Sequence, residues 1–281
     1  MASFTNFATL SYNGGTTNSN IVTGEILEAL TAVKTAVSAN YSAGDRITYA
    51  LSLVNTGTAA ITDYTVTDNL GGYTVGANTV YPLAYNAGTV RYYINGVLQT
   101  APTVTAGPPL TVTGLTVPAG GSAVLIYETT ATPVAPLATG SSITNTATIT
   151  GGGLTNPITA QATVETANSA DLTISKALSP TTVTENGQIT YTFVISNTGN
   201  TEATATGNVV VTDTFAPILR NIAVTYNGTA WTEGTNYTYN AATGVFTTLA
   251  GQITVPAATF TQNTDGTFTV TPGTATLVIT G

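Results

Sequence analysis

The chain repeats one stretch, Leu30-Thr31-Ala32-Val33-Lys34 with Gly44-Asp45-Arg46-Ile47-Thr48-Tyr49 and Leu53-Val54-Asn55-Thr56-Gly57, as Leu172-Thr173-Ile174-Ser175-Lys176 with Gly187-Gln188-Ile189-Thr190-Tyr191 and Ile195-Ser196-Asn197-Thr198-Gly199. Further along, Val66-Thr67-Asp68 returns as Val211-Thr212-Asp213, and Val124-Leu125-Ile126-Tyr127 as Thr276-Leu277-Val278-Ile279. Short alternating stretches separated by Gly, Pro and Asn turns are typical of antiparallel sheets. The repeat therefore predicts an all-β fold with two tandem antiparallel β-sandwich domains of the Ig-like kind.

The composition agrees with this prediction and narrows the function. Only 6% of the 281 residues are charged, and Thr, Ala, Val, Asn and Gly dominate, which favours strands and turns over helices. The net charge is −8 with five Lys and Arg in total, too few to neutralise a row of phosphates, so we expect no nucleic-acid partner. The chain has no Cys and no His. We therefore expect no cofactor, no metal site and no enzymatic activity apart from modification of the chain itself.

The N-terminal residues bear on export. Residues 1–6 lack the basic and apolar regions of a signal peptide, and no run of about 18 apolar residues is present. We expect no membrane insertion. Either a leader has been removed before Met1, or the protein leaves its cell by a route that needs none.

The two repeats differ at their ends. The first repeat closes with the strand Ile143-Thr144-Asn145-Thr146-Ala147-Thr148-Ile149-Thr150, whereas the second ends at Gly281 before any equivalent strand. The stretch Phe4-Thr5-Asn6-Phe7-Ala8-Thr9-Leu10-Ser11 aligns with that closing strand and shares Thr, Asn, Ala and Thr with it. The sequence therefore predicts an N-terminal donor strand segment at 1–28, a complete sandwich at 29–166, and a sandwich at 167–281 that lacks its last strand.

A sandwich that lacks a strand invites pairing with another extended chain. In the donor strand, Phe4, Asn6, Ala8 and Leu10 alternate and would point into the open second repeat of another subunit. Such a head-to-tail contact does not close on itself, so it generates an open filament of identical subunits. The alternative is that residues 1–28 form a frayed terminus or a strand packed on the first repeat, and that the match is chance in a Thr-rich chain.

The chemistry centres on the two lysines of the chain, Lys34 and Lys176, which occupy equivalent positions in the repeats. Strand alternation places both on the apolar face of their strands, and it places Asp68, Asp213 and Asn145 inward by the same test. Burial lowers the pKa of an amine and raises that of a carboxyl. Such a site therefore favours a neutral nucleophile beside a neutral acid.

A neutral lysine can attack an asparagine amide that a protonated aspartate polarises, and the product is an isopeptide bond. The predicted sets are Lys34, Asp68 and Asn145 within the first repeat, and Lys176 and Asp213 with Asn6 of the next subunit. Asp68 and Asp213 would promote the two reactions. The alternative for each set is an ordinary buried salt bridge, or a lysine that reaches solvent beside an aspartate that caps a turn.

An early-strand Lys, Asn-Thr-Gly, Val-Thr-Asp and a closing Asn-Thr-Ala together resemble the bacterial and archaeal surface-repeat domain known as DUF11. The Lys, Asp and Asn set is similar to that of isopeptide-forming Gram-positive collagen-adhesin and pilin domains. The pattern departs in the second repeat, which lacks a closing Asn, and in the donor strand, which has Asn6-Phe7-Ala8. The resemblance implies a cell-surface or spore-surface location and a structural or adhesive role.

The sequence thus favours a structural subunit of an extracellular, pilus-like or spore-surface filament. The rival function is a monomeric cell-surface adhesin or carbohydrate-binding module, in which Trp231, Tyr226, Tyr237 and Tyr239 offer an aromatic platform. A binding module would remain monomeric and keep its affinity without residues 1–12, whereas a filament subunit would lose assembly.

Overall fold

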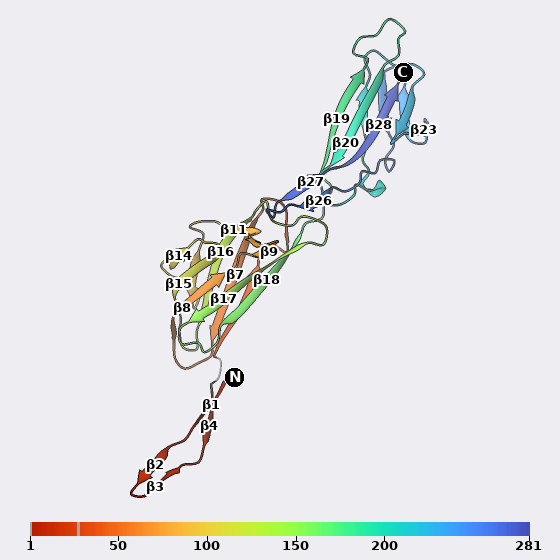
Figure 1. Cartoon of the computed structure of the whole chain (residues 1–281). Coiled ribbons are helices and arrows are strands. Elements are labelled where there is room, and N and C mark those ends of the chain that lie inside the picture. The colour runs from red at the N-terminus through yellow and green to blue at the C-terminus, as the bar shows by residue number, and fades with distance from the viewer. Residues whose placement is uncertain (1, 27–28) are drawn as a thin grey trace. The chain divides into compact units, whose positions relative to one another are not determined.

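The computed structural model describes residues 2–26 and 29–281, so residues 1, 27 and 28 of the predicted donor segment lie outside the described residues. The described chain consists of strands, turns and one short 3-10 helix, η1 (Ala205–Gly207) (Figure 1). The predicted all-β fold is confirmed. By contact the chain divides into two compact units: residues 1–73, 81–132 and 143–164, and residues 74–80, 133–142 and 165–281.

One sheet of the first repeat has the order β13-β12-β16-β7-β5, with β11 paired to β16. These strands are β5 (Leu30–Ala36), β7 (Arg46–Asn55), β11 (Leu83–Tyr85), β12 (Arg91–Ile94), β13 (Val97–Leu98) and β16 (Ser122–Ala131). In β7, every second side chain is buried from Ile47 through Tyr49 and Leu51 to Leu53. This period of two gives the sheet one face toward the core.

The second sheet of the first repeat has the order β14-β15-β8-β17-β18-β6. These strands are β6 (Asn40–Tyr41), β8 (Ile61–Asp68), β14 (Thr103–Thr105), β15 (Leu110–Val117), β17 (Ser142–Gly151) and β18 (Ile158–Thr166). The closing strand β17 pairs with β8 in a register that sets Ala147 opposite Asp68. It buries Ile143, Asn145, Ala147 and Ile149.

The second repeat reproduces five of the six strands of the first sheet, without an equivalent of β11 among the described strands. Its order β19-β20-β28-β22-β23 mirrors β5-β7-β16-β12-β13. The strands are β19 (Leu172–Ser179), β20 (Thr190–Asn197), β22 (Ala223–Tyr226), β23 (Thr229–Trp231) and β28 (Gly273–Thr280). Tyr191, Phe193, Leu277 and Phe246 belong to its buried core. The internal repeat is therefore a repeat of topology as well as sequence.

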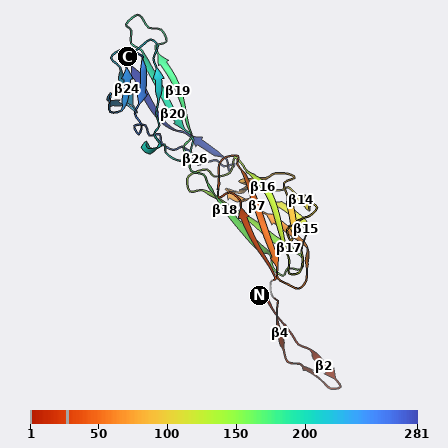
Figure 2. The same cartoon turned by 180° about the vertical axis from the view of Figure 1, so that it is seen from behind.

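The other sheet of the second repeat is smaller. It contains β21 (Thr212–Thr214), β25 (Val245–Thr248) and β24 (Tyr237–Asn240) in that order, so β21 is an edge strand. Since β21 contains Asp213 as β8 contains Asp68, the position beside β21 is the one that β17 fills in the first repeat. Two further hairpins are β9 (Tyr73–Val75) with β10 (Asn78–Val80), and β26 (Thr259–Gln262) with β27 (Phe268–Thr271) (Figure 2).

The N-terminal hairpin, residues 2–26, is a two-stranded ribbon. Strand β1 (Ala2–Asn6) pairs with β4 (Val22–Ile26), and β2 (Thr9–Tyr12) pairs with β3 (Gly15–Asn18). Its described side chains are largely exposed, with Phe4 at 53% and Leu10 at 64%. Isolated hairpins are marginally stable in water because they bury little apolar surface.

Candidate functional site

The candidate site of the first repeat gathers side chains from both sheets. Lys34 lies on β5 of one sheet, and Asp68 and Asn145 lie on the neighbouring strands β8 and β17 of the other. All three are buried: Lys34 is 4% exposed, Asp68 1% and Asn145 0%. The alternation that makes β5, β8 and β17 apolar on one side also turns these polar groups toward the core.

Lys34 and Asp68 form an ion pair inside the sandwich. Lys34 Nζ donates a hydrogen bond to Asp68 Oδ2 at 2.5 Å, and both side chains are inaccessible to solvent. The amine also lies 4.8 Å from the ring centroid of Tyr49 and 5.8 Å from that of Tyr127. Burial lowers the pKa of Lys34 to about 8, although the attraction of Asp68 opposes this shift. The amine is therefore easier to deprotonate than an ordinary lysine.

The Asp68 carboxylate is held on both oxygens. The Tyr127 hydroxyl donates to Oδ2, and the Leu70 N–H donates to Oδ1 at 3.0 Å. Burial raises the pKa of Tyr127 well above its ordinary value, so the hydroxyl remains a donor. These contacts fix the carboxylate beside the amine.

Asn145 is buried with neither amide atom in a hydrogen bond to any described residue. The Tyr49 and Tyr127 hydroxyls lie near this amide, which lowers their pKa values and so opposes the larger rise caused by burial. Neither hydroxyl forms a hydrogen bond with the Asn145 amide. An unsatisfied buried amide costs about 1–3 kcal/mol per group, and such groups are rare in folded proteins. The hydroxyls of Tyr49 and Tyr64 are also buried without a partner, but among the described residues Asn145 alone has two such side-chain atoms.

In the second repeat, the equivalent ion pair is partly exposed to solvent. Lys176 Nζ donates to Asp213 Oδ2, yet the Lys176 side chain is 41% exposed and that of Asp213 18%. The amine lies 4.6 Å from the ring centroid of Tyr191, 5.4 Å from that of Phe193 and 5.5 Å from that of Phe215. The pair and its aromatic surroundings recur, whereas the burial does not.

Other apolar side chains of β19 are exposed as well. Ile174 is 55% exposed and Leu178 41%, on the same strand face as Lys176. In the first repeat, Leu30 and Lys34 on the equivalent face of β5 are buried. The second repeat thus presents an apolar surface around its lysine beside the unpaired edge of β21.

The predicted donor residues lie in the N-terminal hairpin. Phe4 and Asn6 are on β1, Leu10 is on β2, and Ala8 lies at the break between these strands, where its carbonyl accepts a hydrogen bond from the Ser19 N–H. Asn6 pairs with Val22 across the hairpin. The structure thus brings together Lys34 with Asp68, near Asn145, and Lys176 with Asp213, while Asn6 pairs within its own hairpin.

The aromatic cage of the lysines was absent from the sequence-based site. Tyr49 and Tyr191 could have been found, because each ends the repeated Ile-Thr-Tyr motif. Tyr127 could not have been found from the repeat. It lies opposite Tyr49, whereas the residue opposite Tyr191 in the second repeat is Ile279. The two lysine sites therefore share one tyrosine position and differ in the rest of the cage, which is Tyr127 around Lys34 and Phe193 with Phe215 around Lys176.

The aromatic residues considered as a binding platform pack within the second repeat. The rings of Tyr226 and Trp231 stack with centroids 4.8 Å apart, and Tyr237 is only 4% exposed. The hydroxyls of Tyr226 and Tyr239 donate to the backbone carbonyls of Thr254 and Leu219. These rings are therefore used by the fold itself.

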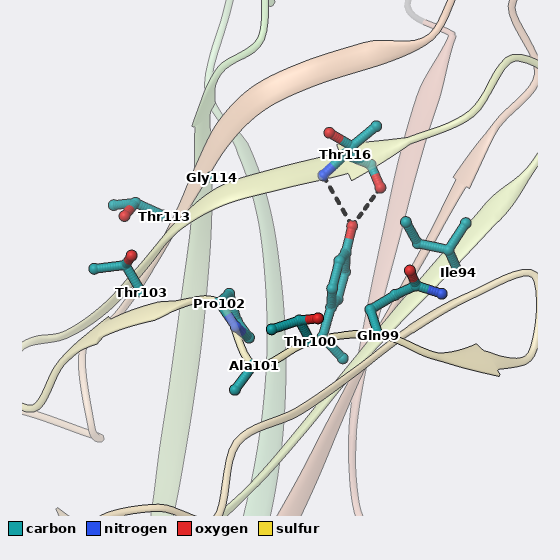
Figure 3. Close-up of a pocket in the computed structure, with 10 residues that line it drawn as sticks. Ile94, Gln99, Thr100, Ala101, Pro102, Thr103, Thr113, Gly114 and Thr116 are labelled. Atoms are coloured by element: carbon teal, nitrogen blue, oxygen red, sulfur yellow. Dashed lines mark hydrogen bonds between the residues drawn. The ribbon is translucent and has the colours of Figure 1, made fainter.

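A groove of 370 Å³ lies between β12 and β15 in the first repeat (Figure 3). Its lining includes Gln99, Thr100, Pro102 and Thr113. The Tyr92 hydroxyl donates to the Thr116 carbonyl and accepts from the Thr116 N–H; dashed lines mark both bonds at Thr116 in Figure 3. Neutral amide, hydroxyl and apolar groups dominate this lining, which brings no acid, base or nucleophile pair together.

Residues 2–26 and 29–281 contain no cluster of three or more His, Cys, Asp or Glu side chains able to hold a metal ion. The same residues form no helix long and apolar enough to cross a membrane.

The fold and the site together define a two-repeat β-sandwich protein with one closed and one open lysine site. The chain matches no protein family and no curated protein sequence, so the resemblance to DUF11 stays a prediction. Similar solved structures include BcpA, the major pilin subunit of Bacillus cereus, at 15% identity and a TM-score of 0.37, covering 96% of this chain and 73% of that one.

Two further solved structures are similar over shorter shares of their own length. The pilus backbone RrgB from Streptococcus pneumoniae has 13% identity and a TM-score of 0.36, covering 86% of this chain and 55% of that chain. The N-terminal domain of the Streptococcus gordonii adhesin Sgo0707 has 14% identity and a TM-score of 0.35, covering 47% of this chain and 31% of that one. The chain thus spans about half or less of these two proteins.

Proposed function

We propose that the protein is a structural subunit of an extracellular filament, pilus-like and located on a cell or spore surface, that polymerises head to tail by donor-strand complementation. The N-terminal strand of one subunit would close the second repeat of the next. Isopeptide bonds would then lock both repeats, and the subunit would act as an enzyme only on itself. Its partner is another copy of the same chain.

The observation that supports this proposal best is the contrast between the two lysine sites. The first repeat has β17 and β18 beside β8 and buries Lys34, while the second repeat leaves Lys176 and Asp213 partly exposed beside the unpaired edge of β21. The N-terminal hairpin contains a close sequence match to the missing strand, with Asn6 at the position of Asn145. Strand addition would give β21 its missing partner and bury the exposed apolar surface.

The unsatisfied amide of Asn145 supports the covalent step. The neutral Nζ of Lys34 would attack Cγ of Asn145, while Asp68 polarises the amide oxygen and passes a proton from the amine to Nδ2. The new bond joins Nζ to Cγ, the Cγ–Nδ2 bond breaks, and ammonia leaves. The same steps apply to Lys176, Asp213 and Asn6 of the neighbouring subunit. A buried amide that is consumed after folding needs no permanent hydrogen-bond partner.

The chain connectivity suits a filament. In the first repeat β18 ends at Thr166 and β19 begins at Leu172, and the N-terminal segment likewise leads into Leu30 at the start of β5. In both places, a pair of closing strands leads directly into the first strand of the following repeat. In the filament, the N-terminal segment would close the second repeat of one subunit and continue into the first repeat of the next. A heterologous contact of this kind propagates without closing.

The test is electrophoresis in hot SDS followed by mass measurement of each band. Wild-type protein should give a ladder in which every rung has lost one ammonia per bond. Asn6→Ala should remove the ladder but leave a monomer that has lost the single ammonia of the first repeat. Asn20→Ala, an exposed asparagine in the same hairpin, is the matched control and should leave the ladder unchanged.

Two results would contradict the proposal. A monomer of unmodified mass that never assembles would overturn both the filament and the crosslinks. Filaments that separate into monomers in SDS would retain the complementation but overturn the bond between subunits.

A further inference from the structure

The first repeat is closed by two strands. Strand β17 pairs with β8, and β18 then lies between β17 and the short strand β6 at the far edge of the sheet. On β6, the side chain of Tyr41 is completely buried. Closure of this sandwich therefore uses two acceptor edges, β8 on one side and β6 on the other.

The second repeat contains an equivalent of the β6 edge. After β6, the Asp45 N–H donates to the Ser42 carbonyl around Gly44, which has a φ of 75°. After β19, the Gly187 N–H donates to the Thr184 carbonyl around Asn186, which has a φ of 62°. The same turn precedes β7 and β20, which fixes the correspondence between the two segments.

This correspondence places Val183 where the first repeat has Tyr41. Tyr41 is 0% exposed, whereas Val183 is 41% exposed. Among the described residues, no strand pairs with residues 181–184. The second repeat thus keeps an apolar side chain at a second edge with nothing to cover it.

The N-terminal hairpin offers two strands with one matching face. Phe4 pairs with Gly24 across the ribbon, and Asn6 pairs with Val22. The Phe4 ring lies across Gly24, with its Cζ only 2.4 Å from where a Cβ on Gly24 would stand. Because directly opposed residues share a face, the face that holds Phe4 and Asn6 also holds Val22, which is 56% exposed.

We propose that the N-terminal hairpin docks as an intact two-stranded unit, with β1 and β2 against β21 and with β4 against residues 181–184 of the partner, so that Val183 becomes buried. This inference rests on the proposed filament and adds a second contact surface to it. Complementation then supplies both strands that β17 and β18 supply in the first repeat, and it leaves no unpaired edge between them.

Hydrogen exchange on the full chain tests the docking directly. Backbone amides of residues 181–184 and of 212–214 are compared between dilute monomer and assembled filament. The proposal expects slower exchange in both segments after assembly, because each gains a strand partner. A single docked strand would slow exchange at 212–214 alone.

A pair of variants gives an independent readout. Val183→Asp places a carboxylate where the docked hairpin would bury it, so the yield of SDS-resistant ladder should fall at least about tenfold. Val270→Asp is the matched control, since Val270 on β27 has a similar exposure of 39% and lies outside both edges. Thermal unfolding of each monomer identifies any variant that fails to fold.

The outcomes separate this inference from the filament itself. Slower exchange in both segments, with loss of the ladder in Val183→Asp alone, supports the two-stranded dock. Slower exchange confined to 212–214, with both variants assembling normally, overturns it and leaves the filament intact. Wild-type protein that shows no slowing in either segment and no ladder overturns both proposals. If Val183→Asp does not fold, the exchange result on wild-type protein decides.

Discussion

Lys34 and Asp68 form a buried ion pair, and such a pair compensates only part of the cost of removing both charges from water. In the proposed reaction, conversion of Lys34 to an amide would remove one of these charges and would use the unsatisfied Asn145 at the same time. The environment that penalises the charged amine would then be the one that makes it reactive.

The lowered pKa of Lys34 gives a prediction for stability. In Asn145→Ala the amine stays free, and its pKa is about 8 in the folded protein and 10.5 when unfolded. Unfolding then takes up a proton between these values, so stability rises with pH in that window and is independent of this group below it. We expect the free energy of unfolding to rise by about 2 kcal/mol between about pH 8 and about pH 9.5.

Denaturant titrations of Asn145→Ala and of crosslinked wild-type protein measure this difference. The tyrosines with raised pKa values are common to both proteins, so the difference in slope reports Lys34. Identical pH dependence in the two proteins would contradict either the crosslink or the lowered pKa.

Asp68 should be essential for the rate of the reaction in the first repeat. Asp68→Asn keeps the shape of the side chain but cannot relay a proton, so formation of the bond should slow by about 10²–10⁴-fold. Mass measurement over time after refolding follows the loss of ammonia. Asp63→Asn, an exposed aspartate with a φ of 57° that asparagine tolerates, should react at the wild-type rate. Equal rates in the two variants would remove Asp68 from the mechanism.

At the scale of elements, the Asn-Thr-Gly motif anchors a loop in each repeat. Asn197 is fully buried, accepts from the Gly199 N–H, and donates to the carbonyls of Thr201 and Pro256. Asn55 makes the same kinds of bond in the first repeat. We expect Asn197→Ala to lower stability by about 2–3 kcal/mol, because buried backbone groups lose their partners.

Urea unfolding of the monomer checks this loss. Asn200→Ala, a less buried asparagine three residues later, provides a reference for the loss of an amide near the same loop. A change of less than about 0.5 kcal/mol in Asn197→Ala would show that the loop is held by other contacts.

The sequence predicted the strands well because sheet alternation is a local property. The repeated strands of Lys34 and Lys176, and the closing strand around Asn145, follow from period-two patterns and from the repeat itself. Residues 1–28 were predicted as a donor segment, but the pairing of residues 2–26 into a hairpin depends on partners across a turn. The aromatic cage joins residues as distant as Lys34 and Tyr127, which only the paired strands bring together.

The exposure of the second lysine site could also not be predicted from strand alternation. Both lysines lie on apolar strand faces, and alternation predicts the same inward direction for each. Burial depends on whether a neighbouring strand is present to cover the face, which is a property of the sheet. The Lys176 side chain is 41% exposed and that of Lys34 0%, and among the described strands only the first repeat has partners in the positions of β17 and β18.

For the whole molecule, the two ends of a filament should differ. A full-length variant with Phe4→Asp and Leu10→Asp would keep an open second repeat but lose its apolar donor face. Its open second repeat could still bind the donor strand of another subunit, but its own donor strand could not bind another second repeat. Small amounts added to wild-type protein should therefore stop growth and shorten the filaments. Length distributions by electron microscopy measure the effect, with Thr16→Asp as the control, because Thr16 lies on β3 opposite Ser11 and so on the other face of the hairpin. Unchanged lengths would contradict donor-strand growth.

The positions of Lys34 and Asn145 near the two ends of the first repeat determine how a pulled subunit would respond. Tension that enters at β5 would cross from Lys34 to Asn145 through the isopeptide bond and leave through β18. Residues 35–144 would bear no load and could not be drawn out. Without the bond, the same segment could lengthen by roughly 370 Å at about 3.4 Å per residue. The crosslink would thus make the fibre nearly inextensible, a tether that transmits force instead of absorbing it.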